Sequence, residues 1–442
     1  MVNPVGRTKK GAMALLWDES FIWGVTAYRA LKEAGLPFAL LRARELKAGL
    51  SGEYPALFVP GGWASNKMRA VGRDGAARIR DFVANGGAYI GFCGGAGMAT
   101  GEGLALINAA RKPTPERVPS FSGPVRLVTN DDPLWKGIDD PVFHAWWPSQ
   151  LSVGRDVSVL AAYGQALPGA FSSDLNVGDT SAAGGWKELE AYYGINLDPA
   201  RMEGDPAVVR GRFGHGTVLL SLVHFDSPGD PNGRRVLRNM WEETVHSFGY
   251  ALDREEAGGP EDPVSLVAVR QTLPPLLEGM KEAVDGLIEL GVRNFLWFPR
   301  NPFMLQWRRG VRGLEYWSLK VLMDEIAELI SARGEDPEQA GGAPGKGRAA
   351  RTEEALAKVK EILLPFVDEA RLLLILERQA MGRERLTFEE SSDSRITAMR
   401  ERLFSRSKSH GGLFKTLIDR MDGILYSLLT EDRPIFQTER SR

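Results

Sequence analysis

The sequence predicts an α/β domain built on a parallel sheet, followed by an all-α helical bundle. Over the first 250 residues, short apolar runs alternate with helix-like segments, which is typical of a parallel sheet covered by helices on both faces. Residues 251–263 are charged and rich in Gly and Pro, as expected of a linker. Beyond this linker we expect helices and no strands, because the apolar residues recur with helical periodicity.

The α/β domain is expected to span residues 10–250. Its strands are predicted from short apolar runs at 12–17, 38–42, 56–60 and 88–92. Helices are predicted at 21–34 and 74–85, because each segment has helical spacing and ends next to Gly. The part from 111 to 199 is rich in Pro, Gly, Ser and Trp and is interpreted as an insertion of strands and loops. The domain is expected to close with a hairpin, 208–212 and 217–223, and a helix at 232–248.

The C-terminal domain is expected to span residues 264–442. Five segments have helical periodicity: 264–290, 314–332, 352–381, 394–405 and 413–429. Residues 333–351 are poor in apolar side chains and are predicted to form a mobile loop. The stretch from Phe295 to Trp317 mixes arginines with aromatic residues. It is expected either to pack within the bundle or to bind a partner.

Composition narrows the class of protein. A chain of 442 residues with 43% hydrophobic residues can bury a large core in two or three domains. A formal net charge of −2 gives no general attraction to nucleic acid or anionic membranes. No segment approaches the roughly 20 apolar residues of a transmembrane helix, and one cysteine excludes an intrachain disulfide. We therefore expect a soluble cytoplasmic protein, and no spacing of ligand residues predicts a metal or cofactor site.

The single cysteine, Cys93, lies in a segment typical of a nucleophile elbow. It follows the predicted strand at 88–92 and is followed by Gly94, Gly95, Ala96 and Gly97. Small neighbours allow the tight turn that presents one side chain at the carboxyl edge of a sheet. A helix beginning after the cysteine would favour the thiolate through its dipole. The alternative is a buried structural cysteine.

A possible partner for the thiol is His224, which follows the apolar run 218–223. Asp226 stands two residues later, where its carboxylate can hold the imidazole in one tautomer. A histidine near a turn aspartate is the alternative interpretation. A cysteine nucleophile needs a base of this kind, oriented by a third group.

This combination resembles the class I glutamine amidotransferase-like superfamily, whose fold is flavodoxin-like. The elbow Gly91-Phe92-Cys93-Gly94-Gly95 matches the family's Gly-x-Cys-x-Gly, and His224-Phe225-Asp226 matches the spacing of its His-Pro-Glu. Within the superfamily, the chain is most similar to the biotin-protein-ligase N-terminal-like branch. The residues behind this similarity are the Gly-rich elbow, the aromatic segment His144-Ala145-Trp146-Trp147-Pro148 and the hairpin Gly214-His215-Gly216. The resemblance covers about residues 10–250.

The resemblance implies roles for specific residues. Cys93 would be the nucleophile, His224 the base and Asp226 the orienting acid. Pro60-Gly61-Gly62 would form the oxyanion loop, so that the oxyanion and substrate-binding residues would be Gly61, Gly62, Gly94, His144 and Trp146. No metal or other cofactor is implied.

Two functions remain open at this point. The first is a cysteine-dependent amidohydrolase or amidotransferase-like enzyme that attacks a carboxamide or acyl group of a small substrate through a thioester. The second is a non-catalytic binding or scaffold protein whose helical domain recruits a partner protein. Gly97 stands where glutamine-using members carry Gln or a similar polar residue, and Asp226 is one methylene shorter than Glu. Both departures favour the second function, whereas the intact Cys93 and His224 favour the first.

Overall fold

The computed structural model describes residues 11–46, 50, 54–246, 274–334, 343–383, 386–387, 391–406 and 408–430. The chain divides into two compact units. The α/β unit contains the described residues up to His246, and the helical unit contains those from 274 onward. The predicted linker, 251–263, lies outside the described residues.

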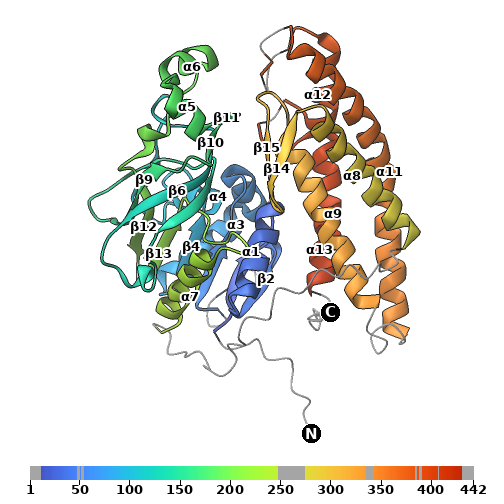
Figure 1. Cartoon of the computed structure of the whole chain (residues 1–442). Helices are drawn as coiled ribbons and strands as arrows, with labels where there is room; N and C mark the ends of the chain where they lie inside the picture. The colour runs from blue at the N-terminus through green and yellow to red at the C-terminus, as the bar shows by residue number, and fades with distance from the viewer. Residues whose placement is uncertain are drawn as a thin grey trace. The chain divides into compact units, whose positions relative to one another are not determined.

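The α/β unit contains a mixed sheet whose first part is parallel (Figure 1). The strand order in this part is β2-β1-β3-β4-β13, and all neighbouring strands are parallel. The strands are β1 (Met13–Leu16), β2 (Phe38–Leu41), β3 (Ala56–Val59), β4 (Ala88–Phe92) and β13 (Gly216–Ser221). The first four agree with the predicted runs, and almost every residue in them is buried.

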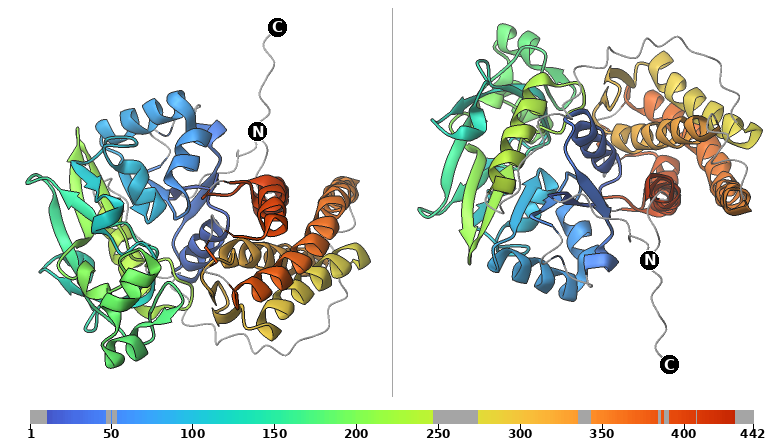
Figure 2. Two further views of the ribbon diagram at one scale, coloured as in Figure 1. Left: turned by 90° about the horizontal axis from the view of Figure 1, so that it is seen from above. Right: turned by 90° about the horizontal axis from the view of Figure 1, so that it is seen from below.

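Helices lie on both sides of these parallel strands (Figure 2). They are α1 (Ile22–Glu33), α2 (Ala43–Leu46), α3 (Ala64–Ala84), α4 (Gly94–Ala99) and α7 (Pro231–His246). Helix α3 begins ten residues before the predicted start at 74. It contains a kink at Gly72, whose φ of 66° interrupts the helical backbone, and this hides the continuous periodicity from sequence inspection.

The second part of the sheet is antiparallel and comes mostly from the predicted insertion. Beyond β13 the order continues β12-β9-β6-β10-β11, and β7 pairs with β6. These strands are β6 (Phe121–Thr129), β7 (Val142–Trp146), β9 (Ser158–Ala166), β10 (Phe171–Ser172), β11 (Leu175–Asn176) and β12 (Pro206–Phe213). The parallel sheet that the sequence predicts is therefore only part of a mixed sheet, whereas the predicted hairpin is confirmed by the antiparallel pairing of β12 with β13. A hairpin such as β12–β13 reverses the chain and imposes antiparallel pairing on the strands added beyond it.

The insertion also contains helices, which the sequence analysis did not predict. These are α5 (Val177–Ala183) and α6 (Trp186–Tyr193), together with the single turns η1 (Thr114–Glu116), η2 (Pro133–Trp135) and η3 (Pro199–Met202). A separate pair of strands, β5 (Ala109–Arg111) and β8 (Leu151–Val153), is antiparallel. The Asn176 side chain caps α5, and Gly184 ends it in a left-handed conformation, which explains a helix of only seven residues.

One contact closes the antiparallel strands on themselves. The N–H of His224, just after β13, donates to the carbonyl oxygen of His144 in β7 over 2.8 Å. Strands β7, β6, β9, β12 and β13 are already linked in that order. The bridge therefore closes these strands into a ring. It places β7 beside the carboxyl ends of the parallel strands, next to Cys93.

The helical unit consists of long helices and one hairpin. The helices are α8 (Pro275–Arg293), α9 (Gly313–Gly334), α11 (Ala343–Ala380), α12 (Ser394–Phe404) and α13 (Gly412–Thr430). The prediction that strands are absent here is wrong, because β14 (Trp297–Asn301) pairs with β15 (Met304–Trp307) in the aromatic-basic segment. Aromatic side chains favour strands, and Trp297 is buried while Phe298 is exposed, as expected of a hairpin with one covered face.

The predicted loop at 333–351 is also shorter than expected. Helix α9 reaches Gly334 and α11 already begins at Ala343, while residues 335–342 lie outside the described part. Residues 346–351, Lys-Gly-Arg-Ala-Ala-Arg, are mostly strong helix formers. The prediction was based on low hydrophobicity, which the first turns of α11 share with loops.

Charged side chains are buried in the core of the helical unit. Arg400 donates to Glu377 over 2.7 Å and to the carbonyl oxygens of Thr387 and Gly310. Glu377 is only 1% exposed. Burial raises its pKa to about 7, although the charges of Arg400 and Arg312 act in the opposite direction. The pair ties α11 to α12 and to the turn before α9.

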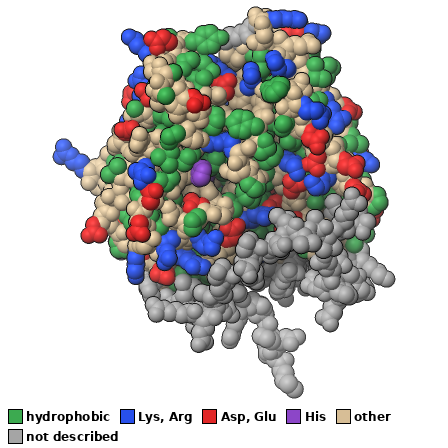
Figure 3. Space-filling view, viewed as in Figure 1, with side chains coloured by type: hydrophobic (Ala, Val, Ile, Leu, Met, Phe, Trp, Pro, Cys, Tyr) green, Lys and Arg blue, Asp and Glu red, His purple; other side chains and the backbone are tan. Residues whose placement is uncertain are grey.

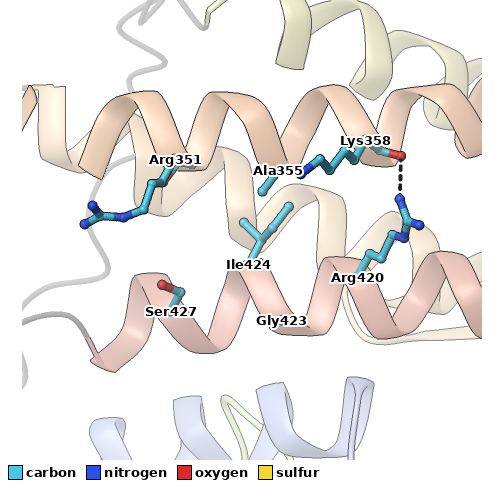
Figure 4. A pocket seen from close by; sticks show the side chains of 8 residues that line it. Arg351, Ala355, Lys358, Arg420, Gly423, Ile424 and Ser427 are labelled. Atoms are coloured by element: carbon cyan, nitrogen blue, oxygen red, sulfur yellow. Dashed lines mark hydrogen bonds between the residues drawn. The ribbon is translucent and has the colours of Figure 1, made fainter. Parts of the chain in front are cut away.

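A groove runs between α11 and α13 of the same unit (Figure 4). Its volume is about 350 Å³, and its floor contains Ala355, Gly423 and Ile424. Arg351, Lys358 and Arg420 lie along its rim. Arg420 donates to the carbonyl oxygen of Lys358 over 3.2 Å, and the Lys358 ammonium pairs with Glu354.

Acidic, basic and hydrophobic side chains are interspersed over the face of the molecule drawn in Figure 3. Neither sign of charge forms an extended field there. Among the described residues, no helix combines the length and apolar character needed to cross a lipid bilayer.

The buried pair leads to a prediction about stability. Replacing Glu377 with Ala leaves Arg400 charged and buried without its carboxylate, so the variant should lose about 3–5 kcal/mol of unfolding free energy. Replacing Glu354, whose pair with Lys358 is exposed, should change it by less than about 0.5 kcal/mol. Chemical denaturation followed by circular dichroism at 222 nm measures both. Equal losses would show that the buried pair does not stabilise the unit.

Candidate functional site

Cys93 lies at the junction between β4 and α4, where its backbone is strained. Its φ of 49° and ψ of −106° are unusual for a residue other than Gly. The Cys93 N–H donates to the carbonyl oxygen of Ser221 in β13 over 2.8 Å, and the Cys93 carbonyl accepts from the N–H of Gly97. These bonds fix the turn between strand and helix and leave the side chain half-buried at the carboxyl edge of the parallel strands.

The glycines after Cys93 are required by close backbone packing. A Cβ on Gly94 would overlap the carbonyl group of Gly62, and a Cβ on Gly95 would overlap the carbonyl group of Val59. The start of α4 therefore lies directly against the loop after β3. Gly62 has a φ of 112°, and a side chain there would strike the carbonyl oxygen of Glu19. By contrast, a Cβ on Gly97 would lie 3.4 Å from that of Ala64, an ordinary contact.

His224 and Asp226 form a buried pair at the same edge. The Nδ1 atom of His224 lies 2.9 Å from Oδ1 of Asp226, and neither side chain is more than 1% exposed. The other ring nitrogen, Nε2, is buried, and an interaction with the Cys93 side chain is among those that raise the pKa of His224. The shorter Asp226 side chain therefore reaches the imidazole, which the sequence alone left uncertain.

The charges around His224 favour its protonated form. Burial opposes an imidazolium, but the charge and hydrogen bond of Asp226, together with the Cys93 side chain, outweigh burial and raise the pKa of His224 to about 10. Cys93 contributes to this rise in the pKa of His224. The thiol and the imidazole therefore interact electrostatically. At neutral pH the imidazole carries protons on both nitrogens.

Aromatic rings hold the imidazole in place. Trp23 of α1 stacks on His224, with ring centroids 4.6 Å apart and an angle of 28°. Trp147 meets Trp23 edge-on at 6.4 Å. A Cβ on Gly61 would come within about 3 Å of both the Trp23 and His224 rings, so the loop after β3 lies against the same stack.

The two aromatic-segment residues predicted for this site both accept hydrogen bonds through their backbone carbonyl groups. The Cys93 thiol donates to the carbonyl oxygen of Trp146 over 3.8 Å, and the carbonyl oxygen of His144 accepts from His224. The His144 and Trp146 rings stack on each other at 5.4 Å. The structure therefore brings all eight predicted site residues to one edge of the sheet.

One residue of this site was not found by the sequence analysis. Trp23 falls within the predicted helix at 21–34, where an aromatic residue normally indicates packing. Its contact with His224 joins residues about 200 positions apart in the chain, so no local pattern identifies it.

The remaining histidines lie elsewhere. His215 is at the turn between β12 and β13, and His410 lies before α13. Burial, together with the charges of Lys415 and Arg312, lowers the pKa of His410 to about 3. Among the described residues, no three Cys, His, Asp or Glu side chains gather as a metal site would require.

Comparisons with known proteins give one local family match. Residues 51–102, which include Gly61, Gly62 and Cys93, match the family described as "Biotin-protein ligase, N terminal". The match covers the loop after β3, helix α3 and the strand–helix junction. The comparison with curated protein sequences gives no match.

Solved structures with a related arrangement are distant. A β-galactosidase from Bacillus circulans sp. alkalophilus is 15% identical with a TM-score of 0.35, over 53% of this chain and 31% of its own. A protein described as a GMP synthase subunit, from Thermoplasma acidophilum, is 11% identical with a TM-score of 0.35, over 54% and 96%. A ThuA-like protein from Bacteroides uniformis is 14% identical with a TM-score of 0.33, over 55% and 96%. The chain thus spans about a third of the β-galactosidase, and these scores do not support a functional argument.

The packing of α4 leads to a prediction. Replacing Gly94 with Ala forces the loop after β3 away from the helix, so this variant should lose at least about 3 kcal/mol of unfolding free energy. The matched replacement of Gly97 by Ala should change stability by no more than about 1 kcal/mol, because the added Cβ makes only an ordinary contact with Ala64 and Ala favours helices. Urea denaturation compares them. A Gly94→Ala variant as stable as the native protein would refute the close packing.

The charges predict the protonation state of His224. Its ring should remain protonated from pH 6 to pH 9, since its pKa is about 10. Replacing Asp226 with Asn removes the charge that offsets burial, so the pKa should fall towards or below the ordinary value of about 6.5. Nitrogen-15 NMR of the imidazole measures this, and replacing the exposed Asp139 with Asn is the control. Titration of the native ring near pH 6.5 would contradict the assignment.

Proposed function

We propose that the α/β unit is a cysteine-dependent amidohydrolase or amidotransferase-like enzyme that acts on a carboxamide or related acyl group through a thioester. In this proposal Cys93 is the nucleophile, His224 the acid and base, and Asp226 the orienting acid. The supporting observation is the buried imidazole that is hydrogen-bonded to Asp226 and electrostatically coupled to Cys93. A nucleophile needs such a partner, and that partner needs a third group to orient it.

The first half of the reaction forms the thioester. An imidazolium beside a thiol favours the thiolate, which attacks the carbonyl carbon, so that a C–S bond forms and the C=O electron pair moves to oxygen. The N–H groups of Gly62 and Gly94 are suited to stabilise this oxyanion, because their backbones are in direct contact. Each such donor contributes roughly 2.7–4 kcal/mol in well-studied enzymes. The C–N bond then breaks, and the leaving amine takes the proton from Nε2 of His224.

The second half releases the acyl group. His224, now neutral, accepts a proton from water or another acceptor as it attacks the thioester carbon. The C–S bond breaks, and the thiolate is restored beside an imidazolium. Throughout, Asp226 and the stacked Trp23 keep the ring in one orientation, so each proton transfer occurs at Nε2.

The fold is consistent with this proposal. The order β2-β1-β3-β4-β13 corresponds to the 2-1-3-4-5 order of flavodoxin-like sheets, in which ligands bind outside the carboxyl ends of the strands. The family match over 51–102 includes both the oxyanion loop and the elbow. Gly97 stands where glutamine-using relatives are expected to carry a polar residue, so we assign a carboxamide or acyl group as the substrate without specifying glutamine.

Alkylation by iodoacetamide tests the proposal without a known substrate. Because Cys93 is the only cysteine, the increase in mass reports its reaction alone. Replacing His224 with Ala should slow alkylation at pH 7 by about 10- to 100-fold, since the thiolate loses its counter-charge. The control is His215→Ala, at the hairpin turn. Equal rates in the native protein and His224→Ala would refute the proposed pair.

A second experiment searches for the acyl group. The native protein and a Cys93→Ala variant are incubated with cell extract, and mass spectrometry then identifies adducts present only on Cys93. An acyl adduct that hydroxylamine removes is expected, because hydroxylamine cleaves thioesters. If every adduct persists in Cys93→Ala, the thioester mechanism is wrong.

The alternative is a scaffold without turnover whose helical unit recruits a partner. The observation that favours it is the groove between α11 and α13, with basic residues along its rim. A protein in which His224→Ala leaves alkylation unchanged, and in which Arg351→Glu abolishes capture of an acidic partner, would support this function instead.

A further inference from the structure

Lys67 is a fully buried lysine that the proposed mechanism does not use. It is the fourth residue of α3, and its side chain is 0% exposed. Among the residues that the structure describes, no other lysine is buried. Lysine is almost never fully buried unless its ammonium has partners, because removing a charge from water is costly. The groups that Lys67 contacts should therefore be held firmly in place.

The ammonium of Lys67 is bonded to the loop between β1 and α1. It donates to the hydroxyl of Ser20 and, over 3.3 Å, to the carbonyl oxygen of Asp18. Ser20 is itself 0% exposed, and its hydroxyl donates to the carbonyl oxygen of Leu16, the last residue of β1, over 3.0 Å. Lys67 therefore ties the start of α3 to the end of β1.

The stem of the same side chain lies against Gly62. A Cβ on Gly62 would come within 3.2 Å of Cε of Lys67 and within 2.6 Å of the carbonyl oxygen of Glu19. Gly62 also touches Gly94, the residue after Cys93. A Cβ on Gly94 would lie 1.7 Å from the Gly62 carbonyl oxygen and 3.1 Å from the Gly62 nitrogen. Direct contacts thus connect Lys67 to the residue that follows the thiol.

The loop between β1 and α1 reaches the imidazole as well. The N–H of Trp23 donates to the carbonyl oxygen of Ser20 over 2.9 Å, and the Trp23 ring stacks on His224. A Cβ on Gly61 would lie 2.9 Å from the Trp23 ring and 3.2 Å from Cε1 of His224. By joining this loop to the loop after β3, Lys67 connects the two segments that contact the candidate base.

We propose that Lys67 is a positioning residue that holds the N–H of Gly62 where it stabilises the oxyanion formed when Cys93 attacks a carbonyl carbon. This inference rests on the proposed function, because it assigns what orients the oxyanion loop of the same site. In this role Lys67 acts through the backbone of Gly62 and does not contact the substrate. Reactions of Cys93 that pass through an oxyanion should therefore depend on Lys67, and displacements at a saturated carbon should not.

Two reagents that modify Cys93 separate these reactions. With p-nitrophenyl acetate, the thiolate attacks the carbonyl carbon and an oxyanion forms. The C–O bond then breaks, which releases p-nitrophenolate and leaves an acetyl thioester. With iodoacetamide, the thiolate displaces iodide from a saturated carbon, and no oxyanion forms. The release of coloured p-nitrophenolate follows the first reaction, and the increase in protein mass follows the second.

Replacing Lys67 with Met keeps an apolar stem and removes the ammonium. The ratio of the acetylation rate to the alkylation rate should fall at least about 10-fold, because complete loss of one oxyanion donor costs about 10²–10³-fold. The fall should lie in the maximal rate constant and not in the ester concentration at half-saturation, since the bound ester carries no oxyanion. Circular dichroism and thermal unfolding verify that the variant folds.

Ser20→Ala is a milder second variant, which keeps Lys67 and removes one of its acceptors. It should lower the same ratio by about 2- to 10-fold, which corresponds to one hydrogen bond. The matched control is Ser318→Ala in the helical unit. Ser318 is also buried, and its hydroxyl donates to the carbonyl oxygen four residues earlier, as that of Ser20 does. Replacing Ser318 should leave the ratio unchanged.

The outcomes distinguish the two proposals. The proposed function fails if His224→Ala changes neither rate, or if the ester leaves no acetyl group on Cys93. If His224→Ala slows both reagents, three results still overturn the role of Lys67: a ratio within twofold of the native value, an equal fall in both rates, or a change confined to the half-saturating ester concentration. Lys67→Met decides where it folds, and Ser20→Ala decides where it does not.

Discussion

The candidate site depends on the close contact between two backbone turns. The first turn of α4 lies so near the loop after β3 that neither Gly94 nor Gly95 has room for a Cβ. This contact packs the loop that contains Gly62 directly against the turn that follows Cys93. Because protein interiors are close-packed, a single methyl group at Gly94 would displace one of the turns.

The inserted strands complete the site. By themselves, β6, β7 and β9 form an ordinary antiparallel extension of the sheet. The hydrogen bond between His224 and His144 turns them back, so that Trp146 accepts from the Cys93 thiol and Trp147 contacts Trp23. The same closure shields His224 and Asp226 from water, and this strengthens their electrostatic interaction. The insertion therefore forms one wall of the site.

The helical unit illustrates a different use of buried charge. Arg400 and Glu377 connect α11, α12 and the turn before α9, where well-packed apolar residues would often be at least as stable. Carbonyl groups of Gly310 and Thr387 also accept from Arg400. In this unit the charged groups join irregular segments whose backbone groups need partners, whereas the buried pair of His224 and Asp226 lies beside a single cysteine.

Local patterns in the sequence predicted the parallel strands, most of the helices and the turn from β4 to α4 that contains Cys93, because each is encoded within a few neighbouring residues. The same patterns gave a wrong start for α3, because the kink at Gly72 interrupts the helical periodicity. They also missed the β14–β15 hairpin, because its aromatic residues indicated packing within a helical bundle. Tertiary structure alone decided that Trp23 stacks on His224 and that β7 reaches Cys93 through its backbone. These contacts join residues far apart in the chain, and strand pairing and ring closure, which no local periodicity records, bring them together.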